Sequence, residues 1–221
     1  MLSTEQQKLD RLADWSVGLE ISGTAVESAA EAREIHIADS LSGLEVPELE
    51  SAETLIDIGS GAGFPGLVLA MALPDAQVTL VDSVRKKMEA AGKIAAELEL
   101  ANVDCVWGRA EEIASAGSDF RESADVVTAR ALAPLPALLE YAAPLLKVGG
   151  TLVAWKGLPS EDELSSAAAA AELLGFDEGR LVETRPFARS QHRHFFVARK
   201  TSETDARFPR RPGMARKKPL A

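Results

Sequence analysis

The chain of 221 residues is long enough for one α/β domain with a sizeable core and short additions. Hydrophobic residues make up 46% of it, and no apolar run approaches the roughly 18–20 residues that a membrane span requires. The single cysteine, Cys105, excludes an intramolecular disulfide, and the first residues lack the basic and apolar regions of a signal peptide. We therefore expect a cytoplasmic protein with no membrane segment.

The formal net charge of -10 argues at first against a nucleic-acid partner, but the charge is unevenly distributed. Residues 201–221 hold six Lys/Arg against two Asp/Glu, so a basic C-terminal tail follows an acidic body. Such an asymmetry suggests a local contact with a polyanion. On charge alone, a solvated tail that aids solubility is an equally good interpretation.

Two amphipathic helices are expected ahead of the main domain. The first covers residues 3–20, where apolar side chains recur near helical spacing, and Gly23 breaks it. The second runs from about residue 24 to residue 41, and residues 43–50 read as a loop. Residues 1–50 are thus expected to form an N-terminal helical extension.

From residue 51 short apolar runs alternate with helical stretches. The runs show little internal alternation, as expected of strands in a mostly parallel sheet that helices cover on both faces. One domain therefore accounts for residues 51–200. The expected strands are 54–58, 77–82, 103–107, 125–129, 150–156 and 194–199, and the expected helices are 66–73, 84–99, 134–147 and 160–174.

This domain is organised around residues 55–66, where an apolar strand breaks into four glycines ahead of a helix. Glycine is needed where the backbone takes a positive φ or where a ligand must come closer than a Cβ allows. A strand, a glycine turn and a helix N-terminus together form a nucleotide-type site at the carboxyl edge of a sheet. The four are Gly59, Gly61, Gly63 and Gly66.

Two cofactor classes use such a turn, and the spacing separates them. The dinucleotide pattern can be read from Gly61, but it should begin directly as the strand ends, and the first glycine after the strand is Gly59. Asp57 ahead of three alternating glycines is typical of proteins that bind S-adenosylmethionine (AdoMet). Asp82 ends the second strand, where a ribose diol needs a two-oxygen acceptor. We interpret the stretch as an AdoMet site; the alternative is a tight turn without a ligand.

Further candidate residues follow the other strand ends. Arg109, Ala110 and Glu111 come after the third strand, beside the position of adenine in an AdoMet-type fold. Glu111 equally suits the first turn of a helix. Arg130 directly follows the fourth strand and can contact the cofactor's carboxylate or a substrate phosphate through a bidentate fork, with a structural ion pair as the alternative.

More polar residues are expected near the same edge. Lys156 and Arg193, together with the two arginines above, can surround the cofactor mouth with positive charge. His36 and Asp39 lie one helical turn apart and form either a helix-stabilising contact or part of the substrate wall. Cys105 lies within the third strand, where a buried structural thiol is favoured over a nucleophile.

As a set, these segments resemble the bacterial RsmG (GidB) family. The resemblance covers nearly the whole chain, and the end of the glycine-rich loop, Phe64 to Gly66, is more distinctive than its glycines. The family usually has an Asn-Leu-Thr segment after the first helix, and residues 21–23 depart from it. The resemblance rests on residues 36–41, 57–66, 80–87, 108–112, 128–131, 155–157, 193–194 and 208–219.

Membership in this family implies a class I AdoMet-dependent methyltransferase with a Rossmann-like, mostly parallel seven-stranded sheet. It implies methylation of N7 of a guanine in the 530 loop of 16S ribosomal RNA. Guanine N7 carries a lone pair and no proton, so the reaction needs no general base, and alignment can supply most of the acceleration. The roles expected are cofactor binding for Gly59, Gly61, Gly63, Phe64, Asp82, Ala110, Glu111 and Arg130, and positioning of the reactants for Arg130, Lys156 and Arg193, with no metal ion.

RNA affinity is expected to come from local cations and not from the overall field. Because the tail follows the last core strand, we expect it to bind RNA and to leave AdoMet affinity unchanged. Phe64 or Trp155 can stack on the splayed base. The partner would be 16S ribosomal RNA within the small subunit or its precursor, and the enzyme a monomer. The RNA-contacting residues are expected to be His36, Arg109, Arg210, Arg211, Lys217 and Lys218.

Three alternatives remain open. A nicotinamide oxidoreductase is weakened by the register of the glycines, and a small-molecule methyltransferase by the basic edge and tail. The third is a ribosome-associated binding protein that has kept an AdoMet fold. Cofactor binding without methyl incorporation into RNA would favour that third interpretation.

Overall fold

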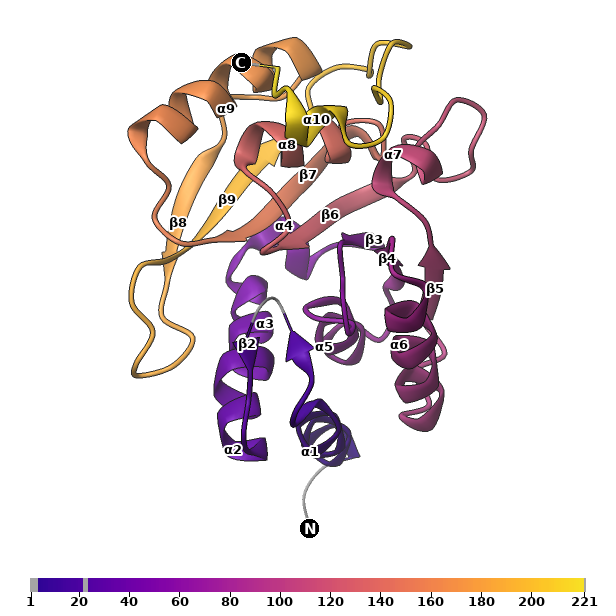
Figure 1. Cartoon of the computed structure of the whole chain (residues 1–221), viewed down its shortest axis with the longest axis vertical. Helices are drawn as coiled ribbons and strands as arrows, with labels where there is room; N and C mark the ends of the chain where they lie inside the picture. Colours follow the sequence, from indigo (N-terminus) through magenta and orange to yellow (C-terminus); the bar gives the residue numbers. More distant parts are fainter. Residues whose placement is uncertain (1–3, 22–23, 221) are drawn as a thin grey trace.

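A seven-stranded sheet lies at the centre of the computed structural model, which describes residues 4–21 and 24–220 (Figure 1). The strand order is β5-β4-β3-β6-β7-β9-β8, and the first five of these strands run parallel. Strand β9 runs antiparallel to both β7 and β8. The predicted Rossmann-like sheet is therefore confirmed. The strands are β3 (Thr54–Ile58), β4 (Gln77–Asp82), β5 (Val103–Trp107), β6 (Ala124–Arg130), β7 (Leu146–Lys156), β8 (Arg180–Thr184) and β9 (Arg193–Arg199).

Strand β3 is the point at which the strand order reverses, because β4 lies on one side of it and β6 on the other. Open α/β sheets bind ligands in the crevice outside the carboxyl ends of the strands at such a point. The parallel register brings Asp57 of β3 opposite Thr128 of β6. It also brings Arg130 opposite Trp155 of β7 at the same edge.

Helices cover both faces of the sheet (Figure 1). Successive strand residues point to opposite faces. Val126 accordingly packs with the N-terminal helices and α5 and α6, whereas Val127 packs with α8 and α9. Both apolar clusters are buried, so the sheet is the shared middle layer. The helices of this region are α5 (Gly66–Ala72), α6 (Arg85–Glu97), α7 (Ala110–Ile113), α8 (Leu135–Ala142), α9 (Glu161–Leu174) and α10 (Met214–Lys217).

The N-terminal region differs from the expected pair of helices. Helix α1 ends at Ser16, and a short β1–β2 hairpin follows where the second helix was expected to begin. That helix starts only at Ala29, because Ser28 Oγ caps it by accepting a hydrogen bond from Glu31 N. Residue 3 and the break at Gly23 lie outside the described residues. The elements are α1 (Thr4–Ser16), β1 (Glu20–Ile21), β2 (Thr24–Ala25), α2 (Ala29–Ala32), the π-helix η1 (Arg33–Ala38) and α3 (Asp39–Leu41).

Three other boundaries require correction. Residues 43–50 are not a loop, because they form the 3-10 helix η2 (Ser42–Glu45) and α4 (Pro47–Glu50). Helix α8 stops at Ala142, and β7 starts early, at Leu146, which pairs with β6 across a bulge. The residue pattern did not predict strand β8 at all. In the described part of the chain no helix is long and apolar enough to cross a membrane.

Candidate active site

The glycine-rich loop leaves β3 in conformations that favour glycine. The φ angles of Gly59, Gly61 and Gly63 are +66°, +59° and +98°. A Cβ on Gly59 would lie 2.5 Å from the Cδ1 atom of Leu132, so this residue also allows a close approach. The predicted tight turn is present, and it brings backbone to the carboxyl end of the sheet.

Asp57 fixes this loop from within the protein. Its Oδ2 accepts a hydrogen bond from Gly66 N at 3.0 Å, and its Oδ1 accepts one from Thr128 Oγ1 at 2.8 Å. The side chain is fully buried, and this burial raises the pKa of Asp57 to about 7 despite the two donors. Asp57 therefore shapes the loop and has no exposed oxygen for a ligand.

A cavity of about 320 Å³ lies beside this loop, at the carboxyl ends of β3, β4 and β5. Its volume falls within the range of small-molecule sites, about 300–1,000 Å³. Asp82 Oδ2 accepts a hydrogen bond from Gly61 N at 3.0 Å, and Oδ1 accepts one from Val84 N at 2.8 Å. Each oxygen keeps a lone pair for a ribose hydroxyl. The lining residues are Gly59, Val81, Asp82, Ser83, Gly108, Arg109, Ala110, Glu111, Leu132, Tyr141, Gly213, Arg216 and Lys217.

The C-terminal tail forms one wall of this cavity. Glu111, at the start of α7, is buried, and its Oε1 accepts a hydrogen bond from Gly213 N at 2.7 Å. Arg216 and Lys217 of α10 line the same cavity. The tail therefore packs on the folded body beside the pocket, contrary to the expectation that it only follows the last core strand.

Arg130 lies in a second cluster at the end of β6, two residues before Leu132 of the cavity lining. Its Nη1 donates to Asp39 Oδ2 at 3.1 Å, and its guanidinium carbon lies 5.8 Å from the centre of the Phe64 ring. Asp39 also approaches Arg193 Nε at 3.5 Å and accepts a hydrogen bond at its backbone oxygen from Trp155 Nε1. Arg130 Nε and Nη2 are buried with no hydrogen-bond partner among the described residues. The structural ion pair thus exists, and two donors remain for a ligand.

His36 completes this cluster. The side chain is 1% exposed and lies against Phe64, with ring centres 5.3 Å apart. Both ring nitrogens lack a hydrogen-bond partner in the part of the chain that the structure describes. Burial, followed by the charge of Arg130, lowers the pKa of His36 to about 4. The imidazole is therefore neutral at pH 7 and has one donor and one acceptor available.

Replacing His36 with Leu tests this assignment. Because folding lowers the pKa of His36 from 6.5 to about 4, the parent protein should lose stability as the pH falls through this window, by about 3 kcal/mol at pH 4. His36→Leu removes that loss. Denaturant unfolding of both proteins at pH 7 and pH 4.5 measures it. Asp57, whose raised pKa acts in the opposite direction, is present in both proteins and cancels in the difference. Parallel pH profiles for the two proteins would contradict the buried neutral histidine.

The predicted cations do not all surround the cavity mouth as unpaired positive charges. Lys156 Nζ lies 2.7 Å from Glu163 Oε1, and Arg210 forms a bidentate pair with Glu140. The structure therefore gives both of these cations an intramolecular partner and leaves Lys156 outside the cavity lining. Arg109, by contrast, is exposed and lines the cavity. Arg211, Lys217 and Lys218 are exposed as well.

The aromatic residues also differ from expectation. Phe64 and Trp155 are 2% and 5% exposed, so neither presents a free face to a splayed base. Trp107 at the end of β5 is 60% exposed instead, and Arg85 lies 5.5 Å from its ring centre. Its indole N–H donates to the oxygen of Ser83, a residue of the cavity wall. The sequence carried one signal for this surface: residues 85–87 are three cations at a helix start, where the dipole disfavours them.

Cys105 was expected to be a buried structural thiol. Cys105 is only partly buried, although burial still raises the pKa of its thiol, which keeps it a poor nucleophile.

A larger hollow of about 640 Å³ lies at the opposite edge of the sheet, near Glu53, Gln77 and Asn102, which precede or start strands. We place the site at the smaller cavity, because ligands of such sheets bind at the carboxyl edge. Within residues 4–21 and 24–220, no His, Cys, Asp or Glu side chains group in a way that could hold a metal ion.

The strand order, the glycine turn and the acceptor at Asp82 define a class I AdoMet-dependent methyltransferase fold. Solved structures agree with it. The S-adenosylmethionine-dependent methyltransferase SibL is 15% identical, with a TM-score of 0.62 over 79% of this chain and 57% of that one. A SAM-dependent O-methyltransferase from Thermotoga maritima is 16% identical, with a TM-score of 0.60 over 90% and 72% of the two chains.

Sequence comparison identifies the family. Residues 6–194 match the family GidB, described as rRNA small subunit methyltransferase G. A protein named Ribosomal RNA small subunit methyltransferase G from Desulfitobacterium hafniense is 36% identical over the full length of both chains. Its namesake from Deinococcus radiodurans is 43% identical over 84% of this chain and 73% of the relative. The chain belongs to this family, which confirms the predicted family, enzyme class and cofactor.

Proposed function

We propose that this protein transfers the methyl group of AdoMet to N7 of a guanine in the 530 loop of 16S ribosomal RNA. The observation that carries the proposal is the position of the Arg130 cluster next to a cofactor-sized cavity at the carboxyl edge of the sheet, in a member of the GidB family. The substrate is ribosomal, so the enzyme acts in the cytoplasm. It acts as a monomer on the small subunit or its precursor.

The residues of the cavity fit AdoMet. Asp82 offers carboxylate oxygens to the ribose diol, and Gly59 leaves space where any Cβ would collide with Leu132. We assign the adenine side of the cavity to Glu111, which lines the cavity beside Ala110. Arg130 Nε and Nη2, which find no partner within the described part of the chain, suit the carboxylate of the methionine part.

When bound, AdoMet supplies an electrophilic methyl group on a sulfonium. The N7 lone pair forms the new bond to this carbon as the carbon–sulfur bond breaks, and the positive charge moves from sulfur to the guanine ring. No proton is transferred in this step, so the protein's task is alignment of the base with the methyl group. The neutral His36 adds no charge near the developing cation.

Asp39 has an electrostatic role in this alignment. An isolated Arg130 cation would repel both the sulfonium and the methylated base. The Asp39 carboxylate, 3% exposed and between Arg130 and Arg193, offsets that charge. The cluster can therefore donate hydrogen bonds without building a strong positive field at the methyl group.

RNA contact is assigned to exposed groups around the cavity mouth. Trp107 offers a stacking face, and the cations Arg85, Lys86 and Lys87 lie at the start of α6, with Arg85 beside the indole ring. Base–aromatic stacking contributes about 1–3 kcal/mol per base. Arg109 and Lys217 are exposed cations that line the cavity and extend this cationic surface.

Trp107→Ala should weaken RNA binding by about 10-fold, within the range of one lost stacking contact. AdoMet affinity should stay the same, because the indole is not part of the cavity lining. Filter binding with a 530-loop RNA fragment and calorimetry with AdoMet measure the two quantities. Trp107→Phe keeps a stacking face and should recover most of the loss. Equal RNA affinity for the parent and Trp107→Ala would remove this surface from the RNA site.

Nucleoside mass spectrometry of 16S ribosomal RNA from cells with and without this protein tests the proposed function. We expect 7-methylguanosine at one position of the 530 loop only when the protein is present. Unchanged RNA, together with measurable AdoMet binding, would favour a ribosome-associated binding protein. Methylation of a small molecule alone would favour the small-molecule enzyme.

A further inference from the structure

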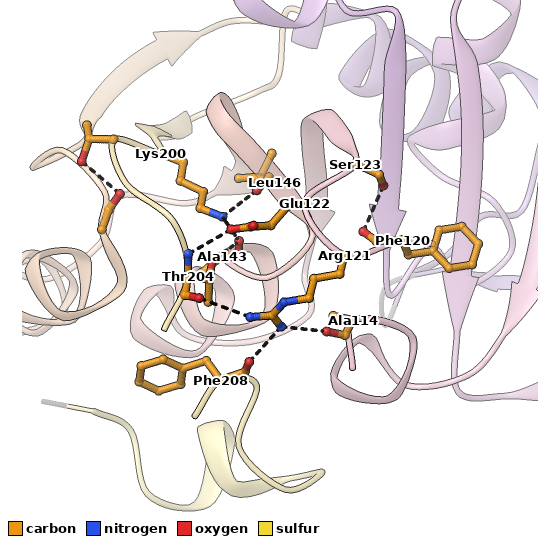
Figure 2. Close-up of polar contacts among 12 residues, drawn as sticks. Ala114, Phe120, Arg121, Glu122, Ser123, Ala143, Leu146, Lys200, Thr204 and Phe208 are labelled. Carbon is orange, nitrogen blue, oxygen red and sulfur yellow. Dashed lines mark hydrogen bonds and ion pairs between the residues drawn. The ribbon is translucent and has the colours of Figure 1, made fainter. Parts of the chain in front are cut away.

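The C-terminal tail is fastened to the body of the protein by buried polar contacts (Figure 2). Arg121 donates hydrogen bonds to the backbone oxygens of Phe208 at 2.9 Å, Thr204 at 3.3 Å and Ala114 at 3.2 Å. A single arginine thus holds two points of the tail against the chain that follows α7. Three carbonyl acceptors on one guanidinium define the path of the backbone closely.

Lys200 provides a second fastening where the tail leaves β9 (Figure 2). Its fully buried Nζ donates to Glu122 Oε1 at 2.6 Å and to the backbone oxygens of Ala143 and Leu146. The same Glu122 oxygen accepts a hydrogen bond from Thr204 N at 2.9 Å. All three donors of the ammonium are satisfied, so this anchor is ordered and specific.

The last part of the tail is docked by an ion pair and by apolar contacts. Arg210 donates from Nε and Nη2 to Glu140, whose side chain is 1% exposed, and also to Lys218 O at 2.9 Å. Phe208 and Ala215 are 3% and 1% exposed and belong to the apolar cluster of α8 and α9. A solvated tail would show neither feature.

We propose that residues 204–218, which we term the C-terminal clasp, are a working part of the cofactor site and couple cofactor binding to RNA binding. The inference rests on the proposed function and deepens it. Gly213 N–H holds Glu111 in place at 2.7 Å, and Arg216 and Lys217 line the cavity. The clasp therefore positions an acidic group on the adenine side and closes that side of the pocket.

The coupling follows from the geometry of this one segment. When the clasp is docked, Glu111 is already in place for the cofactor. When the clasp is undocked, it must become ordered as the cofactor binds, and this cost weakens the apparent affinity for the cofactor. The clasp also carries the exposed cations Arg211, Arg216 and Lys217, which docking fixes on the surface around the cavity. By linkage, a cofactor that favours the docked clasp must increase RNA affinity, and RNA must increase cofactor affinity by the same factor.

Arg210→Ala tests the proposal through binding of S-adenosylhomocysteine, measured by calorimetry. The change leaves Glu140 without its partner and loosens the clasp, so the affinity should fall by about 10-fold, a coupling of ordinary size. Arg185→Ala is the control: it removes the same charge from a side chain that is 81% exposed and forms a salt bridge with Glu183, so the affinity of this variant for S-adenosylhomocysteine should match that of the parent. Because an unpaired buried Glu140 can unfold the protein, the double variant Glu140→Gln with Arg210→Gln serves as the second test, and melting curves show that each variant is folded.

Hydrogen exchange and RNA titration complete the experiment. In the parent protein, S-adenosylhomocysteine should slow amide exchange of residues 208–218, and it should tighten binding of the 530-loop RNA fragment. In the double variant both effects should shrink. Full affinity for S-adenosylhomocysteine in a folded double variant, or in a chain cut after residue 206, would overturn the clasp and leave the proposed function standing. A parent protein that fails to bind S-adenosylhomocysteine would instead contradict the proposed function.

Discussion

Arg130→Ala should abolish most methylation and also destabilise the protein. The change removes the partner that lies 3.1 Å from the buried carboxylate of Asp39 and leaves only the longer contact with Arg193 at 3.5 Å, and breaking a buried ion pair costs up to about 3–5 kcal/mol. The methylation rate at saturating AdoMet should fall by about 100-fold, the loss expected when the reactants are misplaced by about 1 Å. Denaturant unfolding and a radiolabelled methyl-transfer assay at a temperature where the variant is folded measure these effects.

Arg130→Lys separates the two effects. Lysine keeps a positive charge opposite Asp39 but cannot form the planar fork, so stability should recover more than methylation does. If Arg130 were only a structural partner of Asp39, the two properties should recover together. Such parallel recovery would remove Arg130 from the reaction.

Asp82→Ala should weaken AdoMet binding by about 1–3 kcal/mol, or about 5-fold to 150-fold in the dissociation constant. The carboxylate is 9% exposed and already fixed by Gly61 N and Val84 N, so its free lone pairs point to a preformed site. Asp75→Ala is the matched control, because it removes the same charge from an exposed position at the opposite edge of the sheet. Calorimetry that finds equal AdoMet affinity for both variants, or tight NAD binding by the parent, would contradict the assignment of this carboxylate.

The inner strands of the central sheet were predictable because a strand that is buried on both faces appears in the sequence as a short apolar run. Residues 54–58 and 77–82 match β3 and β4 residue for residue. Residues 103–107 match β5 as well; this edge strand is only partly buried, but its residues 105–107 form an apolar run. The glycine turn was equally readable, since positive φ angles restrict the choice of residue. Strand β8 (Arg180–Thr184) was missed because it is a short edge strand with several partly or fully exposed residues and no continuous apolar run.

The remaining errors concern contacts that the local residue pattern does not show. Arg210 reads as a free cation until the fold brings Glu140, 70 residues earlier, against it. Lys156 pairs with Glu163 only seven residues later, across the loop between β7 and α9, and neither helical nor strand spacing shows such a contact. The tail contains few apolar residues, and neither its charge nor its composition shows that Phe208 is buried. The local residue pattern therefore predicted the glycine-rich turn of the cofactor site. The cavity wall that the tail forms depends on tertiary contacts, which the local pattern does not show.

The most direct test of the proposed reaction uses the purified protein with AdoMet and small ribosomal subunits from cells that lack the 530-loop methyl group. Digestion of the RNA followed by mass spectrometry locates any added methyl. We predict one methyl per subunit, on N7 of a guanine in the 530 loop, with S-adenosylhomocysteine formed in equal amount and transfer by Arg130→Ala slowed by about 100-fold. Binding of AdoMet without 7-methylguanosine in naked RNA, in precursor particles or in mature subunits would contradict the proposal.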